Sequence, residues 1–272
     1  MQNNNSIIIV SGTANGPGAL ELQVAARRLG FTASIVAPDD ENIVTQIAEA
    51  THAIYRVGPK SYSLYASLLE KLGGSDREVL AHVLRAFDKR DTFTMLSEAS
   101  ISIPRSWLIK TGDPFSGDTF VVKIPKGNQG RGVELIHNQA ELDAFYKTYA
   151  DEQEYLAQEF IAEAHAQDKR LFVVGDTVVA AMKRTSTTDD FRANLHLGAE
   201  GNVYAPTPEE IDMARQSIAA FGLSYGGVDI IDSSRGPLVL EVNPSPGFGI
   251  SQVTGVDVAN EVIKNLLGVG ND

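Results

Sequence analysis

Cysteine is absent from this chain. Its absence excludes disulfide bonds, thiolate metal sites and a cysteine nucleophile, and it fits a reducing compartment. No apolar run approaches the roughly 18 residues of a membrane-spanning helix, and the segment from Met1 to Asn5 lacks the basic and apolar regions of a signal peptide. We therefore expect a soluble, cytoplasmic protein without a membrane partner.

Positive charge is scarce as well, because 23 lysines and arginines face 35 aspartates and glutamates, for a net charge of −12. An acidic surface repels phosphate backbones, so nucleic acid is not an expected partner. A site for a smaller polyanion would have to be locally cationic, which directs attention to lysines and arginines beside glycines. Apolar residues make up 43% of the 272 residues, enough for the cores of two or three lobes.

The first third of the chain alternates between strand and helix patterns, which is typical of a parallel α/β sheet. Gly12, Gly16 and Gly18 follow the first strand pattern, but GTANGPG does not match the GxGxxG dinucleotide motif, so we interpret them as turn residues. The expected strands are 6–11, 32–37 and 53–57, and the expected helices run from about 20 to 30, over 61–72 and over 78–99.

Pro104 ends the last of these helix patterns, and short strand patterns dominate beyond it. They are expected at 107–110, 120–124, 133–136, 156–160, 171–174 and 177–182, with helices at 139–149 and 208–221 and a closing hairpin of 227–231 and 238–242. This change in character predicts three segments, 1–88, 89–157 and 158–272.

A β-branched strand pattern ends at Lys123 and is followed by a glycine-rich stretch, Gly127-Asn128-Gln129-Gly130-Arg131-Gly132. Glycines let backbone N–H groups turn inward and approach phosphate oxygens. A lysine on the adjacent strand can supply a point charge to the same phosphates. The stretch is not a Walker loop, and the alternative is an ordinary hairpin with a solvated lysine.

The closing hairpin carries two acids among isoleucine, valine and leucine. If its turn centres on Arg235, Asp229 lies opposite Glu241, and Asn243 shares a face with Glu241. Carboxylates that face each other destabilise a sheet unless a cation lies between them. Two carboxylates and an amide oxygen suit Mg²⁺. The alternative is that one acid is solvated at a sheet edge.

Two further stretches are candidates for contacts with a nucleotide. Gln158-Glu159-Phe160-Ile161 could offer backbone groups to an adenine edge and walls to its ring, or it could be a plain core strand. Cations in Asp168-Lys169-Arg170, Lys183-Arg184 and Phe191-Arg192-Ala193-Asn194 could converge on a transferring phosphate, or they could be surface charges. Asp168 is a candidate acceptor for ribose hydroxyls, and Asn194 could bond a reacting oxygen.

The order of a lysine, GxQGxGV, QEFI, Asp-x-Arg, FRxNLH, GVDI and LxLEVNxSPG resembles the RimK family of ATP-grasp ligases, from about Asp88 to Ala259. The resemblance implies an α/β (α+β) ATP-grasp fold. Residues 1–88 would form a Rossmann-like pre-ATP-grasp lobe, 89–157 a small central lobe and 158–272 a C-terminal lobe, with the nucleotide between the last two. The first 85 residues share with the family only α/β character and Tyr55-Arg56-Val57-Gly58, which makes Arg56 a candidate anchor for a carboxylate.

The resemblance also implies ATP and two Mg²⁺ as cofactors, with Mn²⁺ as an alternative ion. The nucleotide would contact Lys89, Lys123, Gly127, Gln129, Gly130, Gly132, Glu159, Phe160, Ile161, Asp168 and Arg170. The metal ligands would be Asp229, Glu241 and Asn243, and the residues that act at the γ-phosphate and acyl oxygens would be Arg192, Asn194 and Arg184.

The implied activity is ATP-dependent amide formation through an acyl-phosphate. A carboxylate attacks the γ-phosphate and an amine then displaces phosphate, so no protein nucleophile is required. L-glutamate is the expected amino-acid substrate, with a carboxylate of a peptide, a protein or a small molecule as acceptor. A ligase for another amine and a non-catalytic ATP sensor are the alternatives, and relatives suggest a homo-oligomer.

Overall fold

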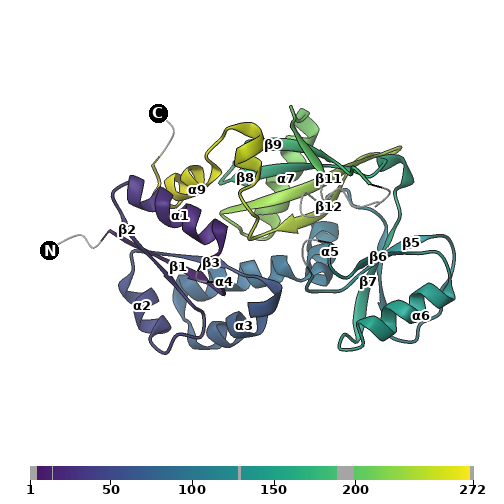
Figure 1. Ribbon diagram of the computed structural model, residues 1–272, viewed down its shortest axis with the longest axis horizontal. Helices are drawn as coiled ribbons and strands as arrows, with labels where there is room; N and C mark the ends of the chain where they lie inside the picture. The colour runs from purple at the N-terminus through teal and green to yellow at the C-terminus, as the bar shows by residue number, and fades with distance from the viewer. Residues whose placement is uncertain (1–4, 14, 128–129, 189–198, 270–272) are drawn as a thin grey trace.

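The computed structural model describes residues 5–13, 15–127, 130–188 and 199–269. Three sheets follow one another along the chain (Figure 1). The first has the strand order β2-β1-β3, the second β4-β7-β5-β6 and the third β10-β9-β8-β11-β12. The first and second sheets lie at opposite ends of the molecule, and the third lies above and between them (Figure 1). None of the helices in the described residues is long and apolar enough to cross a membrane.

The first sheet is parallel and has helices on both faces, and its central strand is a continuous apolar run that is buried on both sides. It consists of β1 (Ser6–Ser11), β2 (Thr32–Val36) and β3 (His52–Arg56). Ile7 and Ile9 pack with α1 (Pro17–Arg28), and Ile8 and Val10 pack with α2, α3 and α4 on the other face. These helices are α2 (Ile43–Glu49), α3 (Tyr62–Lys71), preceded by the short η1 (Pro59–Ser61), and α4 (Gly74–Phe87).

Helix α1 begins and ends two to three residues earlier than expected, and small residues form most of its buried face. Leu20 and Val24 are 39% and 45% exposed, whereas Leu22 and neighbouring alanines form the buried side. Small alanines let α1 lie close to the sheet and to α9 (Val258–Leu266), against which it packs (Figure 1). Leu22 is therefore the one large side chain on the buried face of α1, and the other buried residues are alanines.

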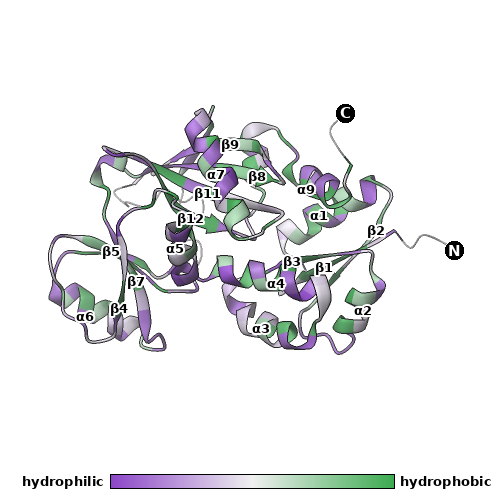
Figure 2. Cartoon of the chain, turned by 180° about the vertical axis from the view of Figure 1, so that it is seen from behind, coloured by the Kyte–Doolittle hydropathy of each residue, from purple (hydrophilic) through white to green (hydrophobic). Residues whose placement is uncertain are grey.

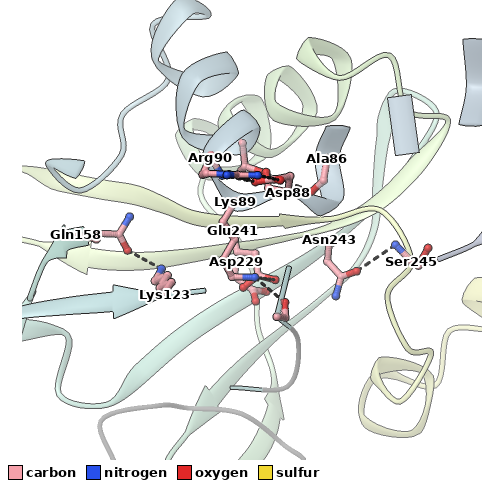
Figure 3. A network of polar contacts seen from close by, with 12 residues as sticks. Ala86, Asp88, Lys89, Arg90, Lys123, Gln158, Asp229, Glu241, Asn243 and Ser245 are labelled. Carbon is pink, nitrogen blue, oxygen red and sulfur yellow. Dashed lines mark hydrogen bonds and ion pairs between the residues drawn. The ribbon is translucent and has the colours of Figure 1, made fainter. Parts of the chain in front are cut away.

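The helix expected over 78–99 is two helices, α4 and α5 (Lys89–Glu98). Asp88 has extended backbone angles between them and accepts a hydrogen bond from the backbone N–H of Arg90. An aspartate N-cap of this kind begins a new helix. The break places Lys89 at the start of α5, where its side chain is directed toward Glu241 (Figure 3).

The second sheet is antiparallel and consists of β4 (Ser106–Lys110), β5 (Phe120–Lys123), β6 (Val133–Ile136) and β7 (Glu154–Glu159). Helix α6 (Gln139–Thr148) contributes Phe145 and Tyr146 to its core, where both rings contact Tyr155 of β7. Figure 2 shows the mixed hydrophilic and hydrophobic colouring of α6 that a helix covering one face of a sheet requires.

The third sheet is also antiparallel, with β8 (Gln167–Val174), β9 (Thr177–Thr185), β10 (Glu200–Val203), β11 (Tyr225–Ser233) and β12 (Gly236–Asn243). Helix α7 (Pro208–Ala220) packs on one face of this sheet, and α8 (Ile250–Thr254) and α9 pack on the other. Strands β8 and β9 are longer than expected, so Asp168 and Arg184 are paired strand residues rather than loop residues.

An ion cluster ties α7 to the back of this sheet. The Lys169 Nζ lies 2.6 Å from Glu210 Oε1 and 2.5 Å from Asp232 Oδ1. The Tyr204 hydroxyl donates to Glu210 as well, and Glu210 accepts a hydrogen bond from the backbone N–H of Thr207 at the start of α7. Burial alone would raise the pKa of Glu210, but Lys169 and these donors lower it below its ordinary value.

Replacing Lys169 with methionine should lower the free energy of unfolding by about 3–5 kcal/mol, because Glu210, 2% exposed, would be left as a buried charge without its cation. The loss should be largest at neutral pH and shrink as pH falls below the ordinary glutamate value of 4.5, because protonated Glu210 no longer needs the lysine. Urea unfolding of the wild type and the variant at several pH values measures the loss of unfolding free energy and its dependence on pH.

The matched control is Arg215→Met, which breaks the exposed pair with Asp176 and should cost no more than about 1 kcal/mol. Equal small effects of Lys169→Met and Arg215→Met would contradict the role given to the buried cluster.

Candidate active site

A cavity of about 840 Å³ lies where the three sheets approach one another. Its walls come from the ends of β1 and β3, from the loop after β5, from the end of β7 and from β8, β9, β11 and β12. Most of the residues that the sequence predicts for the site therefore line one cavity. Gln129, Arg192 and Asn194 lie outside the described residues.

The expected pairing of Asp229 with Glu241 is present. The turn differs from the expected one centred on Arg235. Ser233 pairs with Gly236, so the turn consists of the two residues between them. A β-bulge beside Asp229 then leaves Leu240 without a partner and restores the predicted pairing. The bulge presents both Leu240 and Glu241 to the cavity.

Asp229 is buried and bound by two arginines from neighbouring strands. Its Oδ1 accepts from Arg170 Nε at 2.7 Å, and its Oδ2 accepts from Arg170 Nη2 at 2.6 Å and from Arg184 Nη2 at 2.9 Å. Burial alone would raise the pKa of the Asp229 carboxyl, but the charges of Arg170 and Arg184 hold it far below its ordinary value. The carboxylate is therefore ionised at neutral pH.

Asp168 lies directly across from Arg184 and binds it with both oxygens, at 2.5 Å to Nε and 2.6 Å to Nη2. Burial raises the pKa of Asp168 to about 6, although Arg184 opposes this effect. The predicted contact of Asp168 with ribose would compete with this ion pair.

Two lysines lie on the other side of the carboxylate pair (Figure 3). Lys89 Nζ donates to the Gly127 carbonyl at 2.7 Å and lies 3.9 Å from Glu241 Oε1. Lys123 Nζ donates to Gln158 Oε1 at 2.7 Å. Burial lowers the pKa of Lys123 to about 8, although the nearby Glu241 charge works against the shift.

The glycines after β5 fold the chain back onto Ile124. A Cβ atom at Gly132, which has φ of +68°, would lie 2.4 Å from Ile124 Cγ1, and one at Gly127 would lie 2.6 Å from the Arg131 carbonyl oxygen. Gly130 also has positive φ, at 78°. The predicted glycine loop therefore requires glycine for backbone conformation and close packing.

The end of β7 forms an apolar part of the cavity wall. Phe160 and Ile161 line it together with Ile231 and Leu240, which suits a flat ring. The Glu159 carboxylate is directed to the hairpin turn, where it pairs with Arg235 and accepts from the backbone N–H of Arg105 at 2.7 Å. The side chain of Glu159 thus fixes β7 against its neighbours.

The first sheet also contributes to the cavity wall, through Gly12, Gly16 and Gly18, which were interpreted from the glycine pattern of the sequence only as turn residues. A Cβ atom at Gly12 would lie 2.4 Å from Ser61 Oγ, and one at Gly18 would lie 2.4 Å from Arg56 Nη2. These glycines make room for side chains that come from the end of β3 and the turn after it. The pattern alone carried no sign of this close approach, because Ser61 and Arg56 are distant in sequence.

Asp229, Glu241 and Asn243 fit a divalent cation whose other ligands come from a substrate. Asn243 Oδ1 accepts from the Ser245 N–H at 3.1 Å, which orients its amide (Figure 3). Among the described residues, no three His, Cys, Asp or Glu side chains are grouped as a metal site. Two carboxylates and an amide oxygen next to cationic side chains match a metal bound together with phosphates.

Solved structures with this arrangement of sheets are ATP-grasp proteins. The chain is similar to the D-cycloserine synthetase DcsG, with a TM-score of 0.76 and 15% identity over 97% of this chain and 98% of that one. A RimK domain ATP-grasp protein from Sphaerobacter thermophilus DSM 20745 has a TM-score of 0.72 and 21% identity, over 97% and 100%. The predicted ATP-grasp fold is confirmed.

A family model described as the RimK-like ATP-grasp domain matches residues 86–266. The chain belongs to the RimK-like ATP-grasp family, as its motifs predict.

The curated relatives carry ligase names, and three of them serve as examples. A "Probable alpha-L-glutamate ligase" of Xanthomonas campestris pv. campestris (strain B100) is 41% identical over 68% of this chain and 66% of its own length, just under two thirds. One of the same name from Cellvibrio japonicus (strain Ueda107) is 34% identical over 81% and 82%. A "Ribosomal protein bS6--L-glutamate ligase" of Shigella boydii serotype 4 (strain Sb227) is 38% identical over 72% and 68%.

Nucleotide affinity should fall as pH rises through about 8, because the free protein then loses the Lys123 charge and binding must take up a proton. Each pH unit above that value should weaken ADP binding by up to about tenfold. Titration calorimetry between pH 7 and 9 measures this slope.

Lys123→Arg is the control, since its charge does not titrate in this range and its profile should be flat. Lys123→Ala should bind weakly throughout. A wild-type profile as flat as that of Lys123→Arg would contradict a role for Lys123 at the phosphates.

Proposed function

We propose that this protein is an ATP-dependent carboxylate–amine ligase that forms an amide through an acyl-phosphate. The observation that carries the proposal is the pairing of Asp229 and Glu241 inside a cluster of cations in one cavity. The cations are Lys89, Lys123, Arg170 and Arg184. Such a cluster suits a polyanionic nucleotide, and the carboxylate pair suits the divalent cation that accompanies it.

The proposed nucleotide site lies between the second lobe, residues 89–157, and the third lobe, residues 158–272. Phe160 and Ile161 would contact the base, Lys89 and Lys123 would bind phosphate oxygens, and the glycine loop would exclude water from the γ-phosphate. Bound Mg²⁺, most simply two ions at Asp229, Glu241 and Asn243, supplies charge neutralisation on the phosphates.

The substrate carboxylate would attack the γ-phosphate in line, so that the bond to the β,γ-bridging oxygen breaks, ADP leaves and a mixed anhydride forms. The amine would then attack the acyl carbon, lose a proton and displace inorganic phosphate. Arg184, and Arg192 and Asn194 from the sequence resemblance, are the proposed groups at the transferring phosphoryl and acyl oxygens. The chain supplies position and charge rather than a nucleophile.

L-glutamate is the proposed amine substrate, because the relatives reported above are named as glutamate ligases. The acceptor would be a carboxylate of a peptide, a protein or a small molecule. A ligase that uses another amino acid or amine is the alternative that leaves the same nucleotide chemistry intact.

Arg56 is the proposed anchor for a substrate carboxylate that does not react. Its Nη2 donates to the Pro246 carbonyl at 2.9 Å, and its guanidinium lies over the Phe248 ring, 4.9 Å from the centroid. Its Nη1 is buried without a hydrogen-bond partner in the described structure. A buried donor without a partner is costly, and binding an anion would relieve that cost.

Arg56→Met should raise the KM of the substrate whose unreactive carboxylate it binds by about 10- to 100-fold, the loss of one charge-assisted contact, while the KM of ATP stays unchanged. Gly18→Ala should act in the same direction, because its Cβ would displace the guanidinium. Steady-state kinetics with each substrate varied measures both. An equal rise in the KM of ATP would contradict a separate carboxylate site.

The decisive assay combines ADP release with mass spectrometry of the same reaction containing Mg²⁺, ATP and L-glutamate. We expect ADP together with products that increase by single glutamate residues. Glu241→Gln, which removes one negative charge at nearly constant size, should abolish turnover while the fold persists.

ADP release with a different added mass would replace glutamate by another amine and keep the ligase. Nucleotide binding without turnover over a panel of amino acids and carboxylates would favour the non-catalytic sensor. Failure to bind ATP at all would contradict the proposed function.

A further inference from the structure

Both oxygens of Asp229 are already used by arginines. Arg170 binds the carboxylate with two nitrogens, and Arg184 adds a third bond. A divalent cation that binds Asp229 must take at least one of these oxygens. A cation at the remaining acceptor site of the carboxylate would lie next to a guanidinium of the same charge, so metal binding at this position competes with the arginines.

The two arginines differ in what they would lose in that competition. Arg184 also binds Asp168 through Nε and Nη2, so it stays paired if Asp229 turns to a metal. The hydrogen bonds that Arg170 makes through Nε and Nη2 both go to Asp229, so without them it would be a largely buried cation, with a side chain 15% exposed. Arg170 therefore needs a new anion whenever Asp229 leaves it.

The charge of the cavity points in the same direction. Near the carboxylate pair the cations are Lys89, Lys123, Arg170 and Arg184, and the anions are Asp168, Asp229 and Glu241. The other charged lining residues, Arg56, Arg131, Glu21 and Glu159, add two charges of each sign and leave the balance unchanged. A divalent cation alone would meet a site that is already neutralised. The triphosphate of a nucleotide would reverse the sign and provide an oxygen anion for each freed guanidinium.

We propose that Arg170 couples metal binding to nucleotide binding, because it holds Asp229 until a phosphate group takes its guanidinium. A divalent cation then binds the set Asp229, Glu241 and Asn243 only together with a nucleotide. This inference rests on the proposed function, since it takes the bound phosphates to be those of ATP. Arg170 has the role of a positioning residue for Asp229, and its effect appears in metal affinity rather than only in turnover.

The experiment is a titration of the purified full chain with Mn²⁺, followed by electron paramagnetic resonance. It is done without nucleotide and with a non-hydrolysable ATP analogue, corrected for Mn²⁺ bound to the analogue in solution. The wild-type protein should bind Mn²⁺ at least about tenfold more tightly with the analogue. Arg170→Gln should gain Mn²⁺ affinity in the absence of nucleotide, by about fivefold or more, and should lose most of the enhancement.

Arg215→Gln is the matched control, because it also removes a two-bond arginine–aspartate pair, but one at an exposed position on α7. It should behave as the wild type. Arg170→Lys keeps the charge without the two-bond geometry and should lie between wild type and Arg170→Gln, so it provides the comparison if Arg170→Gln does not fold.

Equal Mn²⁺ affinity of the wild type with and without the analogue would overturn the coupling. Unchanged nucleotide-free affinity in both Arg170 variants would overturn the role of Arg170. If the analogue binds but Mn²⁺ never does, the metal set of the proposed function is wrong, and the inference fails with it. Separate measurement of analogue binding distinguishes these results.

Discussion

The burial of one carboxylate, Asp229, in the middle of an antiparallel sheet constrains much of this structure. A buried charge is costly unless it is paired and hydrogen-bonded. Strand β8, next to β11, and strand β9, one strand further away, carry arginines at the positions that reach it. Strand β12, on the other side of β11, carries Glu241. The resulting cluster is polar, dense and almost neutral, which makes it sensitive to the arrival of a polyanion.

Successive side chains of β8 lie on opposite faces of the sheet, and both faces carry charged residues. Asp168 and Arg170 are directed into the cavity, while Lys169 between them pairs with Glu210 and Asp232 on the back. The ion cluster on the back holds β8, β11 and α7 in one register. That register places Arg170 directly across from Asp229, so packing and electrostatics depend on the same strand.

Local patterns predicted most of the strands and the residues around the cavity, because alternation, glycine content and buried acids are visible in a single stretch of sequence. The opposition of Asp229 and Glu241 was predicted correctly although the turn is centred between Ser234 and Arg235 rather than on Arg235, since the bulge at Leu240 compensates. The break at Asp88 was missed because apolar spacing continues across it, and only the cap geometry reveals it.

The arginine contacts of Asp229 were beyond prediction for a different reason. They depend on how β8, β9 and β11 align with one another, and no single stretch encodes the register of three strands. The same limit applied to Gly12 and Gly18, whose neighbours Ser61 and Arg56 approach only in the folded chain. The separation of sequence signals from spatial partners explains why the sequence predicted residues that line one cavity but not the ion pairs between them.

The most direct test of carboxylate activation by phosphorylation is whether an oxygen atom of the carboxylate substrate appears in the inorganic phosphate. The carboxylate substrate is labelled with ¹⁸O, turned over with ATP and Mg²⁺, and the inorganic phosphate is analysed by mass spectrometry. Attack of the carboxylate on the γ-phosphate predicts one ¹⁸O atom in each phosphate released during amide formation. Phosphate without label would contradict the acyl-phosphate and assign the cavity a different nucleotide chemistry.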